Sequence, residues 1–258
     1  MIEIKQFAPD YPRVGKGVID IPRDITLRKH SYPETVRHPA KNNMYLLEEI
    51  VKYLGDENSV VLDPMAGTGS IMYTASRVKS LFLIELEHVY AMFLDKVKAS
   101  FGSNITVIEG DCRTVLPWKE SIDLIVFSPP YANQIQQHTM TQGGRASSGA
   151  GDFLSHPDNL SLLPDFWFNQ AMVEVYTKCR DSLKPGGHMV VIIKDRMKAG
   201  RRIFLSVQHM QMCLRASGLE VKEQYQHTHL GRLFGAWNKK LGNSQVEEED
   251  IIIFMKGA

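Results

Sequence analysis

The sequence predicts an α/β protein built on a mostly parallel sheet, and three observations indicate this fold class. Short β-branched runs alternate with segments of helical spacing from residue 59 onward. Polar side chains directly follow several of these runs, where a parallel sheet places its ligands. The composition, with 43% hydrophobic and 23% charged residues, is that of an ordinary globular protein with a sizeable core.

The first half of the chain supplies most of the expected sheet. Residues 1–37 are rich in Pro and charged residues and lack periodicity, so we expect an irregular N-terminal arm. A helix is predicted over residues 44–54, with Gly55 as its C-terminal cap. Strands are predicted over residues 59–62, 81–84, 105–108 and 122–127, with helices over 70–77 and 88–100 between them.

The second half begins with an interruption and then completes the pattern. Residues 132–163 have a Gly- and Ser-rich centre, which predicts an insertion that recognises substrate. A helix over 165–183, a turn at 185–187, a strand over 188–193 and a helix over 203–216 follow. Predicted strands over 219–226 and 251–255, joined by a polar loop, read as an antiparallel hairpin.

Charge and cysteine content narrow the class of protein. Thirty Lys and Arg residues against 29 Asp and Glu give a net charge of +1, which excludes a polybasic coating protein but allows a local basic groove. Cys112, Cys179 and Cys213 include no C-x-x-C pair, so we expect neither a disulfide scaffold nor a metal site. Residues 1–6 lack the apolar segment of a signal peptide, so a soluble cytoplasmic protein is expected.

A glycine-containing loop follows the first strand. Its residues are Asp63, Pro64, Met65, Ala66, Gly67, Thr68, Gly69 and Ser70. Glycines at this place let the backbone approach a ligand closely. The loop matches neither the dinucleotide-binding fingerprint nor a P-loop, so a phosphate cradle is disfavoured. A plain strand–helix turn is the alternative.

Two acids follow the second and third strands. Glu85 stands where a carboxylate accepts hydrogen bonds from both ribose hydroxyls of a nucleoside cofactor, with Glu87 as a nearby competitor. Asp111 stands where a carboxylate could accept from an adenine amino group. Each could instead be a solvated acid at the end of a strand.

The fourth strand ends in the tetrapeptide Ser128, Pro129, Pro130 and Tyr131. The two prolines stiffen the turn and leave carbonyl groups without competing backbone donors. The Ser128 hydroxyl and the Pro129 carbonyl can then accept the two hydrogens of an exocyclic amino group. Tyr131 offers an aromatic face on which a flipped base can stack.

These motifs together resemble those of the S-adenosylmethionine-dependent amino-methyltransferases that act on cytosine N4 or adenine N6 of DNA. The resemblance covers residues 38–258 and implies a Rossmann-like class I methyltransferase domain with a seven-stranded sheet. It implies that S-adenosylmethionine, with S-adenosylhomocysteine as product, binds at His38, Pro39, Ala40, Asp63, Pro64, Met65, Ala66, Gly67, Thr68, Gly69, Glu85, Asp111, Cys112 and Ser128. Met65-Ala66 replaces the Phe and small residue of many relatives, so no aromatic contact to the cofactor is expected there.

The resemblance also implies a reaction, and several alternatives stay open. Ser128 before Pro-Pro favours cytosine N4, with adenine N6 and a guanine amino group of tRNA as alternatives. Cytosine C5 methylation is disfavoured because none of the cysteines follows a proline. A nucleotide-binding oxidoreductase would leave the tetrapeptide unexplained, and a catalytically dead binding module would not need the cofactor loop.

Basic residues near the predicted site are candidates for contact with DNA phosphates. These are Arg145, Arg201, Arg202, Arg232, Lys239 and Lys240, although charged residues of this kind are often only solvated. The acidic run at residues 247–250 is expected to be solvated. DNA is the expected partner, and a homodimer and a restriction endonuclease remain open.

Overall fold

The computed structural model describes residues 5–32, 41–132, 156–216, 218–228 and 246–257. The strands are β1 (Arg13–Val14), β2 (Val18–Asp20), β3 (Val60–Asp63), β4 (Ser80–Glu85), β5 (Ile105–Glu109), β6 (Ile122–Phe127), β7 (Leu183–Ile193), β8 (Arg196–Lys198), β9 (Arg201–Ile203), β10 (Leu219–Thr228) and β11 (Glu248–Lys256). The helices are α1 (Ile25–Ser31), α2 (Met44–Leu54), α3 (His88–Val97), α4 (Cys112–Val115), α6 (Asp165–Ser182) and α7 (Leu205–Arg215). Short 3₁₀ helices are η1 (Ser70–Arg77), η2 (Lys98–Ser100) and η4 (Leu160–Leu162).

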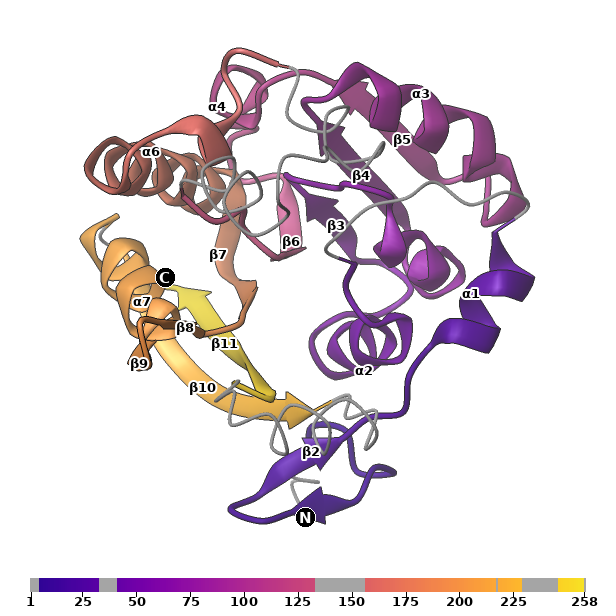
Figure 1. The fold of residues 1–258 in the computed structure, drawn as a ribbon. Coiled ribbons are helices and arrows are strands. Elements are labelled where there is room, and N and C mark those ends of the chain that lie inside the picture. Colours follow the sequence, from indigo (N-terminus) through magenta and orange to yellow (C-terminus); the bar gives the residue numbers. More distant parts are fainter. Residues whose placement is uncertain (1–4, 33–40, 133–155, 217, 229–245, 258) are drawn as a thin grey trace, which may run out of the picture.

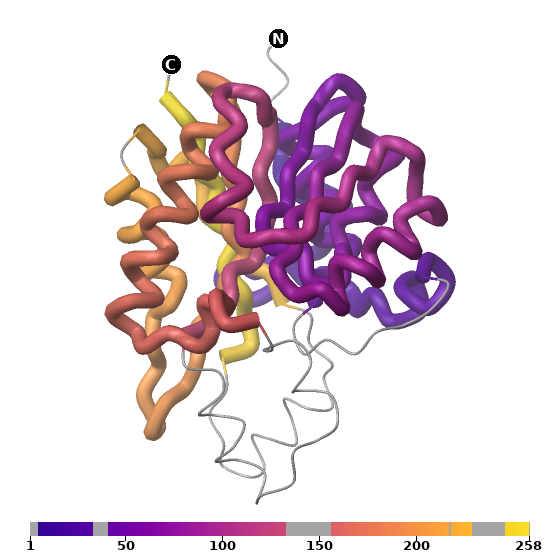
Figure 2. The backbone as a smooth tube through the Cα atoms, turned by 90° about the horizontal axis from the view of Figure 1, so that it is seen from above, coloured from indigo at the N-terminus to yellow at the C-terminus, as the bar shows by residue number. Residues whose placement is uncertain are grey.

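A single large sheet organises the described part of the chain, in the order β1-β2-β10-β11-β7-β6-β3-β4-β5 (Figure 1). Strands β5, β4, β3, β6 and β7 are parallel, and β11 runs antiparallel between β7 and β10. The predicted mostly parallel sheet with its C-terminal antiparallel hairpin is therefore confirmed. Figure 2 shows the N-terminal and C-terminal parts of the chain side by side along this sheet.

The N-terminal arm differs from the expectation. Strands β1 and β2 form a hairpin, and β2 pairs in parallel with β10, where Ile19 is the partner of His227. Helix α1 follows. The arm is therefore ordered over residues 5–32 and extends the sheet from seven strands to nine, because Phe7, Ile19 and Ile21 bury fully against the main core.

Two hydrophobic cores cover the two faces of the sheet. Alternate residues of each strand point to opposite faces, so that Val61 joins one core while Leu62 joins the other. The arm, α2, η1 and α3 cover the first face, and α4, α6 and α7 cover the second. This three-layer arrangement leaves the strand ends as the surface on which a site can form.

Most helices form where the spacing predicts them, and the caps explain their ends. Asn43 begins α2 by accepting hydrogen bonds from the backbone N–H groups of Tyr45 and Leu46, and Gly55 ends it. The expected helix after the first strand is the 3₁₀ helix η1. The turn expected at residues 185–187 instead lies inside β7, where the pairing with β6 shifts register.

Candidate functional site

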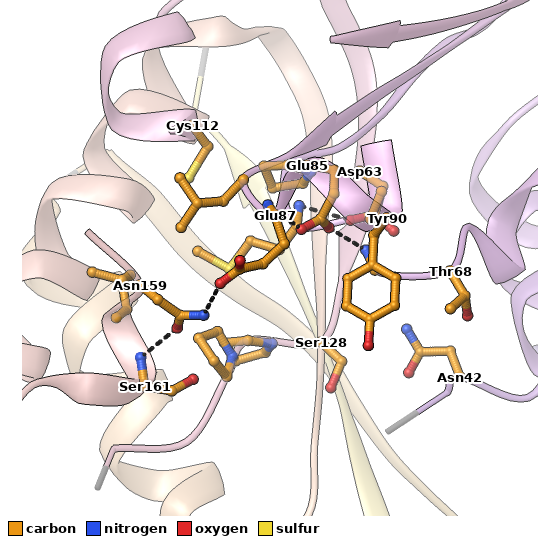
Figure 3. Close-up of a pocket in the computed structure, with 18 of the residues that line it drawn as sticks. Asn42, Asp63, Thr68, Glu85, Glu87, Tyr90, Cys112, Ser128, Asn159 and Ser161 are labelled. Atoms are coloured by element: carbon orange, nitrogen blue, oxygen red, sulfur yellow. Dashed lines mark hydrogen bonds between the residues drawn. The ribbon is translucent and has the colours of Figure 1, made fainter. Parts of the chain in front are cut away.

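A cavity of about 510 Å³ opens at the carboxyl ends of the parallel strands. Four predicted site residues meet there: Asp63 ends β3, Glu85 ends β4, Asp111 follows β5 and Ser128 follows β6. Figure 3 shows Thr68 and Asn42 on one side of the view, Asn159 and Ser161 on the other, and Ser128 between them. The strand order therefore brings together residues that lie up to 65 positions apart in the sequence.

The loop after β3 is shaped by its glycines. Gly67 and Gly69 have φ angles of 54° and 67°, a region that favours glycine. A Cβ atom on Gly69 would lie 2.4 Å from Cδ2 of Leu94, so no larger residue fits without rearrangement. The N–H of Ala66 donates to the carbonyl oxygen of Ile84 at 3.0 Å, which ties the loop to the end of β4. The predicted loop residues 63–68 and Ser70 line the cavity. Gly69, which was also predicted to bind the cofactor, is not among the lining residues and instead shapes the loop.

Glu85 holds the loop through its carboxylate. Its Oε2 accepts from the N–H of Gly67 at 2.6 Å, and its Oε1 accepts from the N–H of Glu87 at 2.9 Å. Each carboxylate oxygen has a further lone pair that could accept from a ribose hydroxyl. Glu85 thus organises the loop as well as facing the cavity.

Asp63 and Glu85 share a poorly hydrated environment. Burial raises the pKa of both carboxyl groups to about 7, and the charge of Glu85 adds to the effect on Asp63. Hydrogen bonds from backbone N–H groups, including that of Met65 to Asp63 at 3.0 Å, oppose the rise. A ligand that brings a positive charge or several donors would favour their ionised forms.

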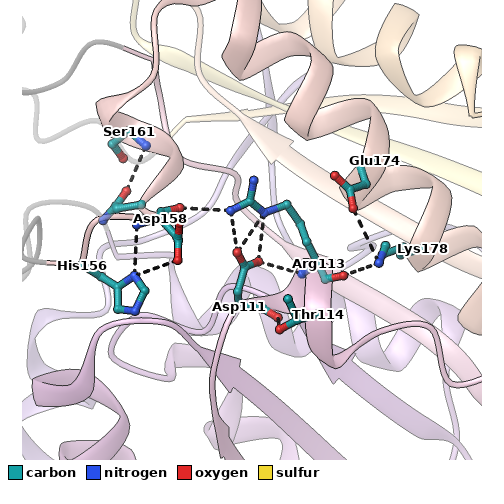
Figure 4. Close-up of polar contacts among 9 residues, drawn as sticks. Asp111, Arg113, Thr114, His156, Asp158, Ser161, Glu174 and Lys178 are labelled. Carbon is teal, nitrogen blue, oxygen red and sulfur yellow. Dashed lines mark hydrogen bonds and ion pairs between the residues drawn. The ribbon is translucent and has the colours of Figure 1, made fainter.

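Asp111 is held by its neighbour Arg113. The guanidinium Nε and Nη2 donate to Asp111 at 2.9 and 2.5 Å, and Nη2 also donates to the carbonyl of Asp158 at 3.3 Å (Figure 4). Asp111 also caps α4 through the N–H of Arg113. Its carboxylate lines the cavity, but Arg113 already takes part of its capacity as an acceptor.

Cys112 lies beside Asp111 and lines the cavity. Burial, with a smaller contribution from Asp111, raises the pKa of its thiol to about 12. The side chain is therefore a neutral thiol near pH 7, which makes a poor nucleophile.

The C-terminal end of the predicted insertion, residues 156–163, forms one wall of the cavity, whereas residues 133–155 of that insertion lie outside the described residues. Asn159 donates to Oε1 of Glu87 at 2.7 Å, and the N–H of His156 donates to Oε2 of the same carboxylate at 3.1 Å. Glu87 is 3% exposed and lines the cavity with Asn159 and Ser161. The sequence analysis named Glu87 only as a competitor of Glu85. It did not single out Asn159, which lies within the predicted insertion at residues 132–163.

The tetrapeptide faces the same cavity. Ser128, Pro129, Pro130 and Tyr131 all line it. Tyr131 accepts at its hydroxyl oxygen from the N–H of Lys194 at 3.4 Å. Burial raises the pKa of Tyr131 to about 12, and the negative charge of Glu249 contributes.

Two charged residues from the C-terminal strands complete this side. Lys194 follows β7, and Glu249 lies near the start of β11; both line the cavity. Glu249 accepts from Nε2–H of the fully buried His227 at 3.0 Å. Since a carboxylate oxygen only accepts, the imidazole must donate here.

The acidic run at residues 247–250 is not solvated as predicted. Asp250 is 2% exposed and accepts from the side-chain amides of Gln224 and Gln226 at 3.0 Å each. Glu249 faces the cavity. The run is partly buried because β11 is a central strand, flanked by β10 and β7.

The predicted phosphate contacts are only partly described. Arg201 is exposed on β9, whereas Arg202 donates to the buried Asp195 at 2.8 Å and lies over the ring of Phe204. Arg202 is therefore partly engaged within the protein. The remaining basic candidates Arg145, Arg232, Lys239 and Lys240, and the predicted cofactor residues His38, Pro39 and Ala40, lie outside the described residues.

The described residues also limit the kinds of site and segment that this part of the chain contains. No group of three or more His, Cys, Asp and Glu side chains there has an arrangement that could hold a metal ion. Within the same ranges, no helix has the length and apolar character needed to cross a membrane.

Comparisons with solved structures identify the fold. The chain is similar to precorrin-8w decarboxylase of Methanobacterium thermoautotrophicum, with a TM-score of 0.53 and 19% identity over 92% of this chain and 100% of that one. It is also similar to the N-methyltransferase NodS of Bradyrhizobium japonicum, determined with S-adenosyl-L-homocysteine, with a TM-score of 0.51 and 15% identity over 83% and 86% of the two chains. TrmN of Thermus thermophilus gives a TM-score of 0.52 at 13% identity, over 84% of this chain and 50% of that one.

These similarities define the fold as that of the class I, Rossmann-like methyltransferases, which confirms the predicted fold class. Sequence comparison with protein-family models and with curated proteins finds no match. The activity must therefore be argued from the site.

Proposed function

We propose that this protein is an S-adenosylmethionine-dependent methyltransferase that modifies the exocyclic amino group of a DNA base, with cytosine N4 as its target. The observation that carries the proposal is the joining of two motifs in one cavity. The loop of Asp63 and the carboxylate of Glu85, at the ends of β3 and β4, form the first side of the cavity, and the Ser128–Tyr131 tetrapeptide, at the end of β6, forms the second.

The first side fits a nucleoside cofactor. The glycine loop leaves room for a close approach, Glu85 and Glu87 supply ribose acceptors, and Asp111 stands beside the buried Cys112 for the adenine. A Cβ at Gly69 would push into Leu94 and deform this loop. When bound, S-adenosylmethionine supplies an electrophilic methyl group on a sulfonium centre.

The second side fits a planar amine. The amino lone pair of cytosine is delocalised into the ring, so the nitrogen is a weak nucleophile. The Ser128 hydroxyl and the Pro129 carbonyl accept its two hydrogens, favour the pyramidal nitrogen and aim its lone pair at the methyl group. The nitrogen would then form the new N–C bond as the bond between the methyl carbon and the sulfonium sulfur breaks, S-adenosylhomocysteine would leave, and the extra proton would pass to water. Positioning and electrostatics would thus provide the catalysis.

A duplex base reaches this cavity only after it is flipped out of the stack. Tyr131 lines the cavity and provides a surface for the flipped ring. Arg201, exposed on β9, and the predicted contacts Arg145, Arg232, Lys239 and Lys240 would bind phosphates. DNA binding is then salt-dependent. We also propose a homodimer, a restriction endonuclease partner and a cytoplasmic location, which the sequence analysis raised.

The test is transfer of label from radioactive S-adenosylmethionine to separate DNA and RNA pools, followed by mass spectrometry of the nucleosides. We expect N4-methylcytosine from the DNA pool. Label found only in RNA, or in neither pool, would overturn the proposal. N6-methyladenine in DNA would keep the reaction class and overturn the choice of base.

A further inference from the structure

Two charged side chains line the cavity without a role in the methyl transfer described above. Lys194 directly follows β7, Glu249 lies in β11, and the sheet order is β6-β7-β11. Because β11 is antiparallel to β7, the start of β11 lies at the same edge as the end of β7. Ile193 and Asp250, the residues next to the pair, are register partners.

Both residues lie at the tetrapeptide. The N–H of Lys194 donates to the hydroxyl oxygen of Tyr131 at 3.4 Å, and the Nζ of Lys194 lies 3.5 Å from the carbonyl oxygen of Glu247. The charge of Glu249 acts on Tyr131 strongly enough to contribute to its raised pKa. Both residues therefore line the cavity close to Tyr131, the side chain on which the proposed function places the ring of the base.

Glu249 is held in place from behind. His227 is fully buried and donates from Nε2 to Oε2 of Glu249 at 3.0 Å, across a register pair of β10 and β11. The following residue, Asp250, is fixed by two hydrogen bonds from the side-chain amides of Gln224 and Gln226. A carboxylate that is positioned by a buried partner such as His227 can discriminate between ligands because it cannot move away from an unfavourable one.

Bases differ in the order of donors and acceptors along their edges. Cytosine and adenine place an amino donor beside a ring nitrogen that accepts, whereas uracil and thymine place a carbonyl acceptor beside a ring N–H. An ammonium group only donates, and an ionised carboxylate only accepts. A buried polar group that meets a like partner is left unpaired, which makes such a site selective.

We propose that Lys194 and Glu249 read the edge of the substrate ring and select amino-bearing bases over oxo-bearing ones. This inference rests on the proposed function. Lys194 donates to the ring acceptor beside the amino group, which is N3 in cytosine. Glu249 makes the amino side of the site negative, so a donor is favoured there and a carbonyl oxygen is repelled.

The test of Lys194 uses a duplex that the wild-type protein methylates and the same duplex with 3-deazacytosine at the target. The analogue keeps the amino group but replaces N3 with C–H. We expect the analogue and the Lys194→Met variant each to lower kcat/KM about tenfold, the loss typical of a hydrogen bond to a charged group. The analogue should not lower the kcat/KM of Lys194→Met any further, because the two changes remove the same contact. Losses that multiply would overturn the assignment.

The test of Glu249 uses binding with S-adenosylhomocysteine present. The wild-type protein should bind a duplex with cytosine at the target at least about tenfold more tightly than the same duplex with uracil. Glu249→Gln should bring this ratio towards one, because an amide both donates and accepts. An unchanged ratio would overturn the role of Glu249.

Controls separate this inference from a folding defect and from the proposed function. Glu248→Gln changes a neighbouring acid that does not line the cavity. Lys119→Met changes an exposed lysine just before β6, at the amino ends of the parallel strands and away from the cavity at their carboxyl ends. Both should keep the wild-type ratios, and all variants should bind S-adenosylhomocysteine normally. A wild-type protein that methylates no base would overturn the proposed function itself, whereas an active wild type with unaltered variants would overturn this inference alone.

Discussion

The two halves of the cavity are built in different ways. The half formed by β3, β4 and β5 is fixed by the chain itself: Glu85 accepts from two backbone N–H groups, and Arg113 holds Asp111. The half formed by β6, β7 and β11 carries Ser128, Lys194 and Glu249 around a stiff Pro-Pro turn. In the proposed function, the first half binds the cofactor, and the second half presents donors and acceptors to the ring of the substrate base.

The two halves also differ in the residues that support them from behind the cavity. On the first half, the hydroxyl of Tyr32 donates to the carbonyl oxygen of Gly69 at 2.7 Å, and Arg28 donates to Oγ of Ser70 at 3.1 Å. Both residues belong to the N-terminal arm. On the second half, His227 and the glutamines of β10 provide the corresponding support. Support for the two halves therefore comes from opposite ends of the chain.

The largest effect is expected at the second half. Ser128→Ala removes the side-chain acceptor of the substrate amino group, so kcat should fall about 10²- to 10³-fold, as for other preorganised polar groups at a reacting atom. The affinity for S-adenosylhomocysteine, measured by isothermal titration, should stay within about twofold of wild type. Ser121→Ala, at an exposed serine, is the matched control. Unchanged turnover of Ser128→Ala would contradict the role of this hydroxyl.

Gly69→Ala should damage the first half selectively. The new Cβ would clash with Leu94 and adopt an unfavourable φ, so we expect about 1–3 kcal/mol of lost stability and a weaker cofactor affinity. Gly200→Ala has a similar φ of 75° but open space around its Cβ. Thermal unfolding and titration with S-adenosylhomocysteine compare the two. If Gly69→Ala and Gly200→Ala lowered the affinity for S-adenosylhomocysteine equally, the loss would come from φ strain and not from the shape of the loop after β3.

The buried acids predict a pH dependence of the ligand-free protein. The pKa values of Asp63 and Glu85 rise to about 7 on folding, from about 4 in an unfolded chain. The folded state then binds more protons between these values, so the free energy of unfolding should fall as pH rises from about 4 through 7. In Asp63→Asn, the decrease in the free energy of unfolding over this pH range should be smaller by on the order of 2 kcal/mol.

Urea unfolding at pH 5 and pH 8 measures this effect, with Glu57→Gln as an exposed control. An Asp63→Asn variant with the wild-type pH dependence would contradict the buried state of this carboxyl group.

The smallest effect is expected from the support behind the loop. Tyr32→Phe removes the donor to Gly69 but leaves the second donor, the N–H of Met72, in place. The affinity for S-adenosylhomocysteine should fall about three- to tenfold, which corresponds to about 1 kcal/mol. Tyr53→Phe removes a hydroxyl that donates to Glu223 and does not face the cavity. It should affect stability without affecting this affinity, and a reversed order would contradict the supporting role of the arm.

Sequence patterns predicted the residues that a strand end places in the cavity. Asp63, Glu85 and Ser128 follow buried runs, and the carboxyl ends of parallel strands meet at one edge of the sheet. The same rule did not reveal Glu249, because β11 is antiparallel and offers the cavity its beginning instead of its end. The acidic sequence around it resembled a solvated run, and only the position of β11 between two strands shows otherwise.

The sequence also did not predict which distant segments contact each other. Asn159 with Glu87, and Tyr32 with Gly69, are 72 and 37 residues apart. Neither pair has a periodicity or spacing that marks it. The arm was expected to be irregular because β1 and β2 are too short to show alternation, and their pairing with β10 is a tertiary event.

Hydrogen–deuterium exchange with and without S-adenosylhomocysteine tests the central claim, the division of one cavity into two halves, most directly. Exchange should slow in peptides that cover residues 63–70 and 85–90, because these supply the contacts of the first half. Exchange should stay unchanged in peptides around Lys194 and Glu249, because we propose that these residues contact the base and not the cofactor. Protection confined to the second half, or none in either, would contradict the account.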